Sequence, residues 1–595
     1  MTPSTLNQIF LSGAERFAGR PAAMRRKIEG MWQNISYDAL RTRVRHLGLA
    51  LQSLGLVAGD RVAIISENRP EWAVADYACL LTRLVDVPIY TTLTPHQIAY
   101  MLRDSGARAI FVANRTYLDK ILEIRSQLPD LTHLILFDGP APGPDVMMLD
   151  ELESRGAGID ANRWEAEAGA VQPDDLATLV YTSGTTGEPK GVMLSHGNIT
   201  SNVVASLNLL QVGAADEYLS FLPLCHIFER MVGHFTMMQA GAVVSYATSF
   251  DTVVTELPEI QPTIVASVPR LYEKIFTRVA DTANSAGGLA RAIFAWSQDV
   301  GRDRLQYTLF DKPVPLGLAL RNQIADALVF SKLRRRLGGR IRFLVSGGAP
   351  LSADICRFFI AAGLPLIEGY GLTETSPVIA FNDVHRLRPG TVGLPLTGVE
   401  VSFAGDGEIL VRGPNVMKGY YHKPEATAEA IDRDCWFHTG DIGEFDAEGS
   451  LRITDRKKDL IKTSGGKYVA PQPIEGLLKL NKHFANAVML GDRRRFPIML
   501  VVPNFAALAE WLAAEGIASL SPEELVRMPA VQDRVEREAR KSLRDLAQFE
   551  MPKKFVLVPR DFTIESGELT ATLKVKRKVV EEHFHDAIEA AYAES

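Results

Sequence analysis

One stretch decides which fold and chemistry to expect of this chain: Tyr181-Thr182-Ser183-Gly184-Thr185-Thr186-Gly187-Glu188-Pro189-Lys190-Gly191. Its last ten residues hold three glycines, four hydroxyl side chains and one lysine. Glycine lets the backbone curl around an anion and present N–H groups to it. The hydroxyl groups add donors, and Lys190 adds a positive charge. The composition is that of a loop that binds a triphosphate.

Two common phosphate-binding patterns do not describe this loop. No Ser or Thr follows Lys190, so it is not GxxxxGK[ST], and its glycine spacing is not GxGxxG. A Gly/Thr-rich segment taken alone is as compatible with a flexible surface loop as with a binding site. The apolar run 176–181 predicts a strand that leads directly into the loop, and 191–195 predicts a strand that follows it.

The rest of the first third predicts an α/β fold. Apolar runs predict strands at 61–66, 85–90, 107–112 and 133–137, with a helix at 70–81 between the first two. Strands that alternate with helices predict a parallel sheet covered on both faces. We therefore expect a large N-terminal domain built from two doubly wound α/β subdomains.

The character of the sequence changes near Gly390. Short alternating segments with Gly and Pro turns continue to about Ile453, which predicts a small β subdomain. The charged run Asp455–Asp459 is the expected linker. The expected division is an N-terminal adenylation domain at 1–455 and a small mobile α+β domain at 456–595.

Composition limits the function. A chain of 595 residues is too long for a single hydrophobic core, so several domains are expected. The proportions of 46% apolar and 23% charged residues are typical of globular proteins. A net charge of −6 argues against a general nucleic-acid binder. Four cysteines without metal-like spacing predict reduced thiols. Neither a leader pattern nor an apolar stretch of about 20 residues is evident, so we expect a cytoplasmic protein, with peripheral contact at the inner membrane surface left open.

The loop and a series of later motifs resemble those of the adenylate-forming enzymes: acyl-CoA synthetases, luciferases and peptide-synthetase adenylation domains. Gly369-Tyr370-Gly371-Leu372-Thr373-Glu374-Thr375 resembles the adenine and metal motif of that family. The resemblance implies that Tyr370 and Gly371 lie against the base, that Thr373 contacts the α-phosphate and that Glu374 binds Mg²⁺. The implied phosphate-binding residues are Thr182, Ser183, Gly184, Thr185, Thr186, Gly187 and Lys190.

Two further motifs complete the implied nucleotide site. Ser346-Gly347-Gly348-Ala349-Pro350 resembles the turn whose bare backbone, at Gly347, Gly348 and Ala349, covers the other face of the adenine. Thr439-Gly440-Asp441 resembles the ribose motif, with Arg456 as the second ribose contact and Lys458 at the domain hinge. Taken singly, each of these segments is equally compatible with a plain turn or a solvated charged loop.

The C-terminal motifs imply two half-reactions. Leu569–Arg577 resembles the segment that carries the catalytic lysine, here Lys574, with Lys576 as a minor rival. Ala571 stands where the long-chain branch usually has proline. The resemblance implies that the small domain then rotates, and that Gly465, Gly466 and Lys467 replace Lys574 and admit the pantetheine arm of coenzyme A.

A resemblance to one branch of the family indicates which kind of acid the protein would activate. Leu222-Pro223-Leu224-Cys225-His226-Ile227-Phe228-Glu229-Arg230 resembles a segment of long-chain acyl-CoA synthetases, as does the helical insertion at 285–337. His226 then lies beside the acyl carbonyl or the pocket entrance, although a buried structural histidine fits nearly as well. The acyl pocket is expected to be lined by residues from His226 to about Ala240 and by 343–345.

The resemblance as a whole implies ATP- and Mg²⁺-dependent activation of a long-chain fatty acid to an acyl-adenylate, followed by transfer to coenzyme A. An acyl-adenylate former that uses a carrier-protein thiol, or a ligase for medium-chain or aryl acids, remains an alternative. A non-catalytic nucleotide- or lipid-binding relative is a third. Homodimer formation is left open.

Overall fold

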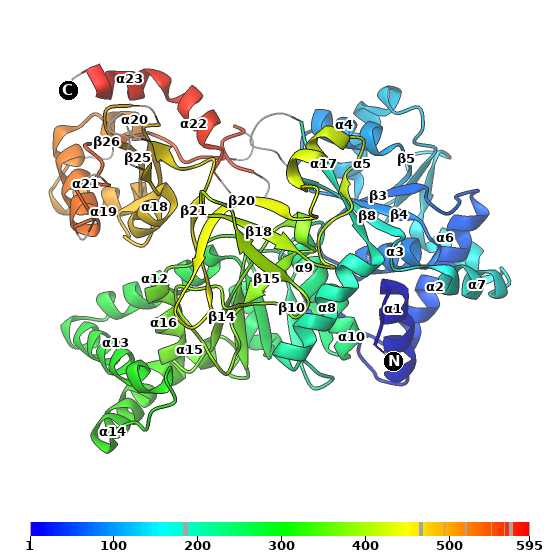
Figure 1. Ribbon diagram of the computed structural model, residues 1–595, viewed down its shortest axis with the longest axis horizontal. Coiled ribbons are helices and arrows are strands. Elements are labelled where there is room, and N and C mark those ends of the chain that lie inside the picture. Colours follow the sequence, from blue (N-terminus) through cyan, green and yellow to red (C-terminus); the bar gives the residue numbers. More distant parts are fainter. Residues whose placement is uncertain are drawn as a thin grey trace.

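The computed structural model describes residues 2–182, 188–462, 468–492, 494–517, 520–544, 546–548, 550–563, 566–570 and 575–593. The fold is α/β, as expected, with sheets of mixed direction (Figure 1). The strands of the first 395 residues form two large sheets, one of which also includes a short strand at 419–420. Smaller sheets follow toward the C-terminus.

The first large sheet holds the ends of the phosphate loop. Its order is β19-β9-β8-β4-β3-β5-β6-β7. The strands are β3 (Arg61–Ile65), β4 (Val85–Ile89), β5 (Ala107–Val112), β6 (His133–Leu136), β7 (Val146–Met148), β8 (Leu176–Thr182), β9 (Lys190–Ser195) and β19 (Gly419–Tyr420). All strands expected here are present. The expectation of a purely parallel sheet is wrong at one edge, because β8 and β9 form an antiparallel hairpin and β19 adds to β9 antiparallel.

The second large sheet has parallel central strands and antiparallel edges, in the order β16-β15-β14-β13-β12-β10-β11-β1-β2. Its strands are β1 (Met24–Ile28), β2 (Met31–Ile35), β10 (Glu217–Ser220), β11 (Val243–Tyr246), β12 (Ile264–Ser267), β13 (Phe343–Ser346), β14 (Leu366–Gly371), β15 (Val378–Phe381) and β16 (Leu394–Pro395). The motif at 369–375 therefore lies at the carboxyl end of β14, where parallel α/β sheets present their ligand sites.

Helices cover both large sheets. They include α1 (Leu6–Arg16), α3 (Pro70–Leu81), α8 (His196–Leu210), α12 (Pro269–Ser285), α13 (Gly288–Thr308), α14 (Leu316–Ala325), α15 (Ser331–Arg336) and α16 (Ala353–Ala361). The insertion at 285–337 is helical but broken, because Gly287 takes a left-handed φ of 102° and prolines precede α14. Ser352 is the N-cap residue of α16, and its side chain makes no capping hydrogen bond.

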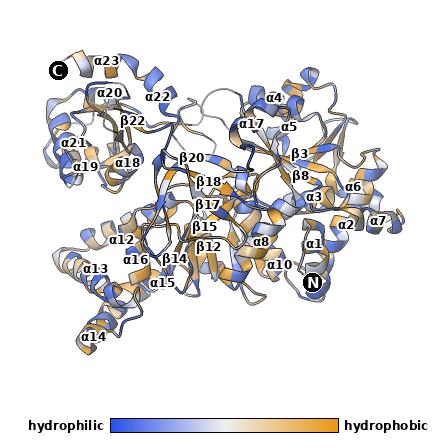
Figure 2. Ribbon diagram, in the orientation of Figure 1, coloured by the Kyte–Doolittle hydropathy of each residue, from blue (hydrophilic) through white to orange (hydrophobic). Residues whose placement is uncertain are grey.

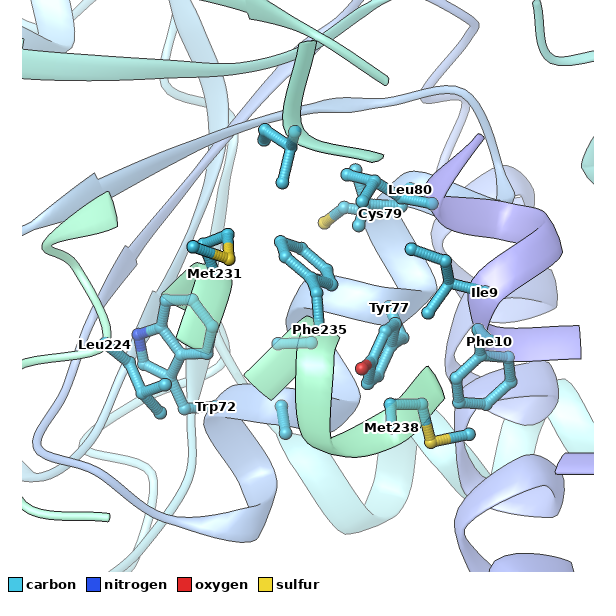
Figure 3. Packing of buried hydrophobic residues seen from close by; sticks show 14 of the residues in the cluster. Ile9, Phe10, Trp72, Tyr77, Cys79, Leu80, Leu224, Met231, Phe235 and Met238 are labelled. Atoms are coloured by element: carbon cyan, nitrogen blue, oxygen red, sulfur yellow. The ribbon is translucent and has the colours of Figure 1, made fainter. Parts of the chain in front are cut away.

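A dense core lies between α1, α3 and the π-helical segment η2 (Arg230–Thr236) (Figure 3). The rings of Phe10 and Tyr77 lie 4.5 Å apart, and Tyr77 packs edge-on to Phe235 at 6.0 Å. All twelve residues of α3 are buried. Because interiors are close-packed, η2 is held in a fixed position against the first sheet.

The remaining strands form smaller sheets. A four-stranded antiparallel sheet contains β17 (Glu400–Phe403), β18 (Glu408–Arg412), β20 (Phe437–Phe445) and β21 (Leu451–Arg456). A three-stranded sheet follows, with β24 (Phe484–Leu490), β25 (Ile498–Pro503) and β26 (Lys554–Leu557). Helices that pack beside it include α18 (Pro471–Lys479), α21 (Pro529–Ser542) and α22 (Arg577–His583). None of the described helices is both long and apolar enough to cross a membrane.

Candidate active site

A cavity of about 1070 Å³ collects residues from all of these sheets. Most of the site residues expected from the sequence line it: Thr182, Lys190, His226, Gly347, Gly348, Tyr370, Gly371, Thr373, Glu374, Asp441, Arg456 and Lys458. Ala349 is not among the described lining residues. Ser183, Gly184, Thr185, Thr186, Gly187, Gly465, Gly466, Lys467 and Lys574 lie outside the described residues.

The ends of the phosphate loop are fixed by strand pairing. Thr182 on β8 is opposite Lys190 on β9, and Tyr181 is opposite Gly191. A Cβ at Gly191 would lie 3.1 Å from the Tyr181 ring, so a larger residue here would force that ring to shift. The Tyr181 hydroxyl donates to Asp104 Oδ2 over 2.6 Å. Both ends of the loop are thus held at the cavity.

A second group of contacts joins β14 to the small antiparallel sheet. Tyr370 Oη donates to Asp441 Oδ2 over 2.7 Å, and Arg456 Nε lies 3.2 Å from Asp441 Oδ1. Asp441 and Arg456 are paired residues of β20 and β21. Burial and the neighbouring Asp441 carboxylate raise the pKa of Tyr370 well above its usual range. Tyr370 therefore stays a neutral hydrogen-bond donor beside the carboxylate.

Glu374 is joined through Tyr420 to Lys190, at the end of the phosphate loop. Its Oε1 accepts a hydrogen bond of 2.9 Å from the hydroxyl of Tyr420, a residue of β19. Lys190 Nζ lies 4.7 Å from the centre of the same Tyr420 ring. Tyr420 thus links the lysine at the end of the loop to the carboxylate expected to bind Mg²⁺. No sequence pattern pointed to it, because Gly419-Tyr420-Tyr421 reads as an ordinary aromatic turn.

The glycine turn after β13 approaches its neighbours closely. Gly348 has a left-handed φ of 79°. A Cβ on Gly347 would come within 3.0 Å of the Phe228 ring. A Cβ on Gly348 would meet only Val268, at 3.8 Å, so Gly348 leaves space that a larger residue would fill.

His226 caps the short helix α9 (Ile227–Glu229). Its Nδ1 accepts the backbone N–H of Phe228 over 3.1 Å. A neutral ring in this geometry carries its proton on Nε2. His226 is half-buried and lines the cavity.

One end of the cavity is apolar. The expected lining residues Met231, Val232, Met237, Phe343 and Val345 are present there. Apolar side chains outside the expected segments also line the cavity. They come from the end of α8, from β12 and from β15, and include Leu210, Val212, Ile264 and Phe381. Their positions follow from the stacking of the two sheets, which no local pattern specifies.

A buried ion network supports η2, which forms part of this apolar wall. Arg230 Nη2 lies 2.5 Å from Asp76 Oδ1 and 2.8 Å from Asp86 Oδ1, and its Nη1 donates to Thr178 Oγ1 over 2.9 Å. Burial and Asp76 raise the pKa of Asp86 to about 7, although Arg230 opposes that shift. Thr178 belongs to β8, so the network joins the apolar wall to the strand that leads into the phosphate loop.

Glu229 is a second buried acid in the same segment. It accepts hydrogen bonds from Tyr218 Oη over 2.7 Å and from Ser220 Oγ over 2.6 Å. Burial raises its pKa to about 8. Glu229 is therefore mostly protonated at neutral pH.

The C-terminal part of the chain closes the cavity. Thr570, Val575 and Arg577 line it, and they flank Lys574 in the sequence. Arg577 Nη1 lies 2.5 Å from Glu475 Oε1, which also accepts the backbone N–H of Met489 over 2.8 Å. An isolated antiparallel bridge joins Leu569 to Val575. These contacts fix both ends of the predicted lysine segment against the three-stranded sheet.

Comparison with known families agrees with this arrangement. The sequence profile of the AMP-binding enzyme family matches residues 10–421, and that of the AMP-binding enzyme C-terminal domain matches residues 458–595. The chain belongs to the AMP-binding enzyme family. The two matches together include most of the residues that line the cavity, whereas Asp441 and Arg456 lie in the short stretch between them.

Named relatives within the family are similar over most of their length. The long-chain-fatty-acid–CoA ligase FadD15 of Mycobacterium bovis is 37% identical, over 95% of this chain and 94% of the relative. The peroxisomal long chain acyl-CoA synthetase 6 of Arabidopsis thaliana is 34% identical, over 95% and 82%. Among solved structures, the adenylation domain of a carboxylate reductase from Mycobacterium chelonae matches with a TM-score of 0.80 at 23% identity, covering 99% of this chain and 91% of that one. The last comparison supports the fold.

Proposed function

We propose that this member of the AMP-binding enzyme family is a long-chain fatty acid–CoA ligase, which forms an acyl-adenylate from ATP and transfers the acyl group to coenzyme A. One observation carries the proposal. A single cavity is lined both by residues of the predicted nucleotide motifs and by apolar side chains, among them Met231, Val232 and Phe343. The names of the relatives support the same reaction.

The polar residues that line the cavity offer hydrogen-bonding groups that match those of ATP. The Asp441 carboxylate accepts hydrogen bonds, as the two ribose hydroxyls require, and Arg456 and Tyr370 orient it. The space beside Gly348 would admit a flat base near Tyr370. Thr182 and Lys190 hold the loop ends at the place where the phosphates would lie.

The residues present also fit a magnesium ion. Mg²⁺ is usually held by one or two carboxylates together with substrate phosphates, and Glu374 supplies one carboxylate at the cavity. No cluster of three or more His, Cys, Asp or Glu side chains able to hold a metal occurs among the described residues. When bound, the ion would neutralise phosphate charge. Glu374 would hold it, with Tyr420 orienting the carboxylate.

The first half-reaction needs positioning and charge stabilisation. An oxygen of the fatty acid carboxylate attacks the α-phosphorus, the bond to the β-phosphate oxygen breaks, and pyrophosphate leaves. Thr373 would donate to the α-phosphate, and Lys574 would bridge it to the carboxylate. His226, which lines the cavity and is fixed by the hydrogen bond from the Phe228 N–H to its Nδ1, would lie beside the acyl carboxylate.

The second half-reaction needs a different face of the small domain. The coenzyme A sulfur attacks the acyl carbonyl carbon, the bond to the AMP oxygen breaks, and the thiol proton is released. We propose that the small domain after Lys458 rotates about this residue between the steps and brings Gly465, Gly466 and Lys467 to the site. Thr570 and Val575, which flank Lys574 in the sequence, line the cavity, and this supports adenylation as the step that the described arrangement would serve.

The proposal is tested by supplying ATP, Mg²⁺, coenzyme A and straight-chain acids of increasing length. We expect pyrophosphate release to rise with chain length into the long-chain range, and we expect acyl-CoA of the correct mass. Acyl-AMP without thioester would favour a carrier-protein acceptor, and preference for short or aryl acids would contradict the long-chain assignment. Absence of pyrophosphate release with every acid would contradict the enzyme assignment itself.

A further inference from the structure

The helix α14 presents an apolar face to solvent. Leu316, Leu320, Ile324 and Leu328 are 89%, 61%, 47% and 41% exposed. They are spaced by four residues along α14 and the π-helical turn η3 (Asp326–Phe330), so they form one stripe. Figure 1 shows that α13 and α14 extend away from the rest of the molecule, and Figure 2 shows the apolar colour along α14.

The stripe belongs to a firmly packed segment. Ala325 and Phe330, on the inner side of the same helical run, are buried in the core that also contains α16. A Cβ on Gly301 of α13 would come within 2.7 Å of Ala361, so α13 packs closely on α16. Arg334 is paired with Asp326 over 2.7 Å. The outer apolar face is therefore presented by a fixed helix rather than by a loose end.

Cations surround the stripe. Between residues 309 and 340 the chain has seven arginines and lysines against two aspartates, whereas its overall net charge is −6. Of the two aspartates, Asp326 is already paired with Arg334. Six of the seven cations are exposed: Lys312, Arg321, Lys332, Arg335, Arg336 and Arg340.

The two properties together select the partner. A contiguous exposed apolar face marks a contact with a protein or a membrane. An exposed apolar helix face beside Arg and Lys is the combination that binds the surface of an anionic bilayer, where the apolar side chains enter the acyl region and the cations meet the headgroups. A second copy of this chain would place the same cations against one another.

We propose that α14, η3 and their flanking cations form a docking surface for an anionic lipid bilayer. The surface is separate from the cavity residues described above, and binding to lipid does not depend on the proposed reaction. If that reaction is also correct, docking would place the enzyme where long-chain fatty acids are dissolved.

The test is co-sedimentation of the full chain with vesicles of phosphatidylcholine alone or with about one third phosphatidylglycerol. We expect binding to the anionic vesicles that weakens with salt. The variant Leu316→Gln/Leu320→Gln should bind about tenfold or more weakly, since each leucine contributes apolar area. Glutamine is a good helix former, so the helix should remain intact.

Matched variants separate this surface from general effects. Met31→Gln/Leu394→Gln changes two other exposed apolar residues, which are 66% and 46% exposed, and should bind as the wild type does. Arg321→Gln/Lys332→Gln/Arg335→Gln should lose most of the anionic preference, whereas Arg41→Gln/Lys482→Gln/Lys553→Gln, with the same charge change at other exposed sites, should retain it.

Three outcomes would overturn the proposal: equal binding to both vesicle types, equal loss in the matched controls, or a wild-type dimer in solution that Leu316→Gln/Leu320→Gln converts to a monomer without altering vesicle binding. Circular dichroism confirms that each variant is folded. Pyrophosphate release with a water-soluble acid should be unchanged in the α14 variants, which separates loss of docking from loss of the proposed activity.

Discussion

Asp441 connects two sheets through its carboxylate, which Tyr370 and Arg456 hold from opposite sides. Asp441→Asn removes the charge and one acceptor while it keeps the side-chain shape. Because a hydrogen bond to a charged group contributes about 1.5–3 kcal/mol, we expect kcat/KM for ATP to fall by about 10- to 150-fold. Steady-state kinetics with ATP as the varied substrate checks this.

The control for Asp441 lies on the same strand. Glu444 of β20 is exposed, so Glu444→Gln should leave the kinetics for ATP unchanged. An unchanged kcat/KM in Asp441→Asn would remove the ribose role of Asp441. A loss that affects the acid but not ATP would indicate a different position of the nucleotide.

Glu229 predicts a pH dependence of stability. Its folded pKa of about 8 lies above its ordinary value of about 4.5, so the folded state keeps a proton that the unfolded state loses. The stability that Glu229 provides is complete below about pH 4.5 and is lost as pH rises toward 8. Relative to Glu229→Gln, the wild type should lose about 1.4 kcal/mol per pH unit within this window.

Urea unfolding of both proteins between pH 5.5 and 7.5 measures that difference. Glu444→Gln serves again as the exposed control and should follow the wild type at every pH. Parallel curves for wild type and Glu229→Gln would mean that Glu229 is ionised in the folded protein, because the hydrogen bonds from Tyr218 and Ser220 then outweigh the effect of burial on its pKa.

Residue types alone could predict many of the residues that line the site, but not the residues that hold them in position. The phosphate loop, Tyr370, Glu374 and Asp441 stand in compact motifs, so the sequence predicted them and the structure brings the described ones together. Tyr420 and Arg230 act through partners that are distant along the chain; Asp76 is 154 residues from Arg230. Such pairs arise from the packing of sheets and leave no local pattern.

At the scale of elements, η2 depends on the buried network around Arg230. Arg230→Met should destabilise the fold by about 3–5 kcal/mol, because it leaves Asp76 and Asp86 buried without their cation. The surface pair of Arg412 and Glu400 has a similar separation of 2.7 Å but is exposed, so Arg412→Met should change stability little. Thermal or urea unfolding compares the two variants.

The same variant tests whether η2 positions the apolar wall. If it does, any folded Arg230→Met protein should show a raised KM for a long-chain acid with a smaller change for ATP. Equal stability of Arg230→Met and Arg412→Met would show that the buried pair is not needed to hold η2. A mainly ATP-linked defect would place the effect on β8, through Thr178, instead.

Elements were predicted well wherever one local signal dominated. The buried strands at 61–66, 85–90 and 107–112 read as short apolar runs bounded by turns, and β3, β4 and β5 occupy them. The antiparallel pairing of β9 with β8 was missed, since strand direction depends on how tightly the loop turns. The break before α14 follows from Pro313 and Pro315. The expectation of a continuous helical insertion gave these two prolines too little weight.

For the whole molecule, the question is how two half-reactions share one cavity. Lys457 is tied to the small antiparallel sheet, with Nζ 2.6 Å from Asp406 and 2.8 Å from Glu408. β21 ends at Arg456, and Arg577 anchors the predicted lysine segment to Glu475. The chain between these fixed parts, beginning at Lys458, is where a rotation would be absorbed.

Lys458→Pro should therefore separate the half-reactions. Proline fixes φ and removes the backbone N–H, so it restricts rotation at that residue. Since the structure has the segment flanking Lys574 at the cavity, we expect the variant to form acyl-adenylate at near the wild-type rate and to slow thioester formation by about 100-fold or more. Single-turnover assays of each step give the two rates.

Two companion variants make the result decisive. Lys458→Ala keeps the backbone free and should carry out both steps normally, which excludes a role for the lysine side chain. Lys574→Ala should show the opposite pattern to Lys458→Pro, with adenylation lost and the reaction of supplied acyl-adenylate with coenzyme A retained. Equal loss of both steps in either variant would contradict a rotating domain, because a single fixed arrangement would then have to serve both reactions.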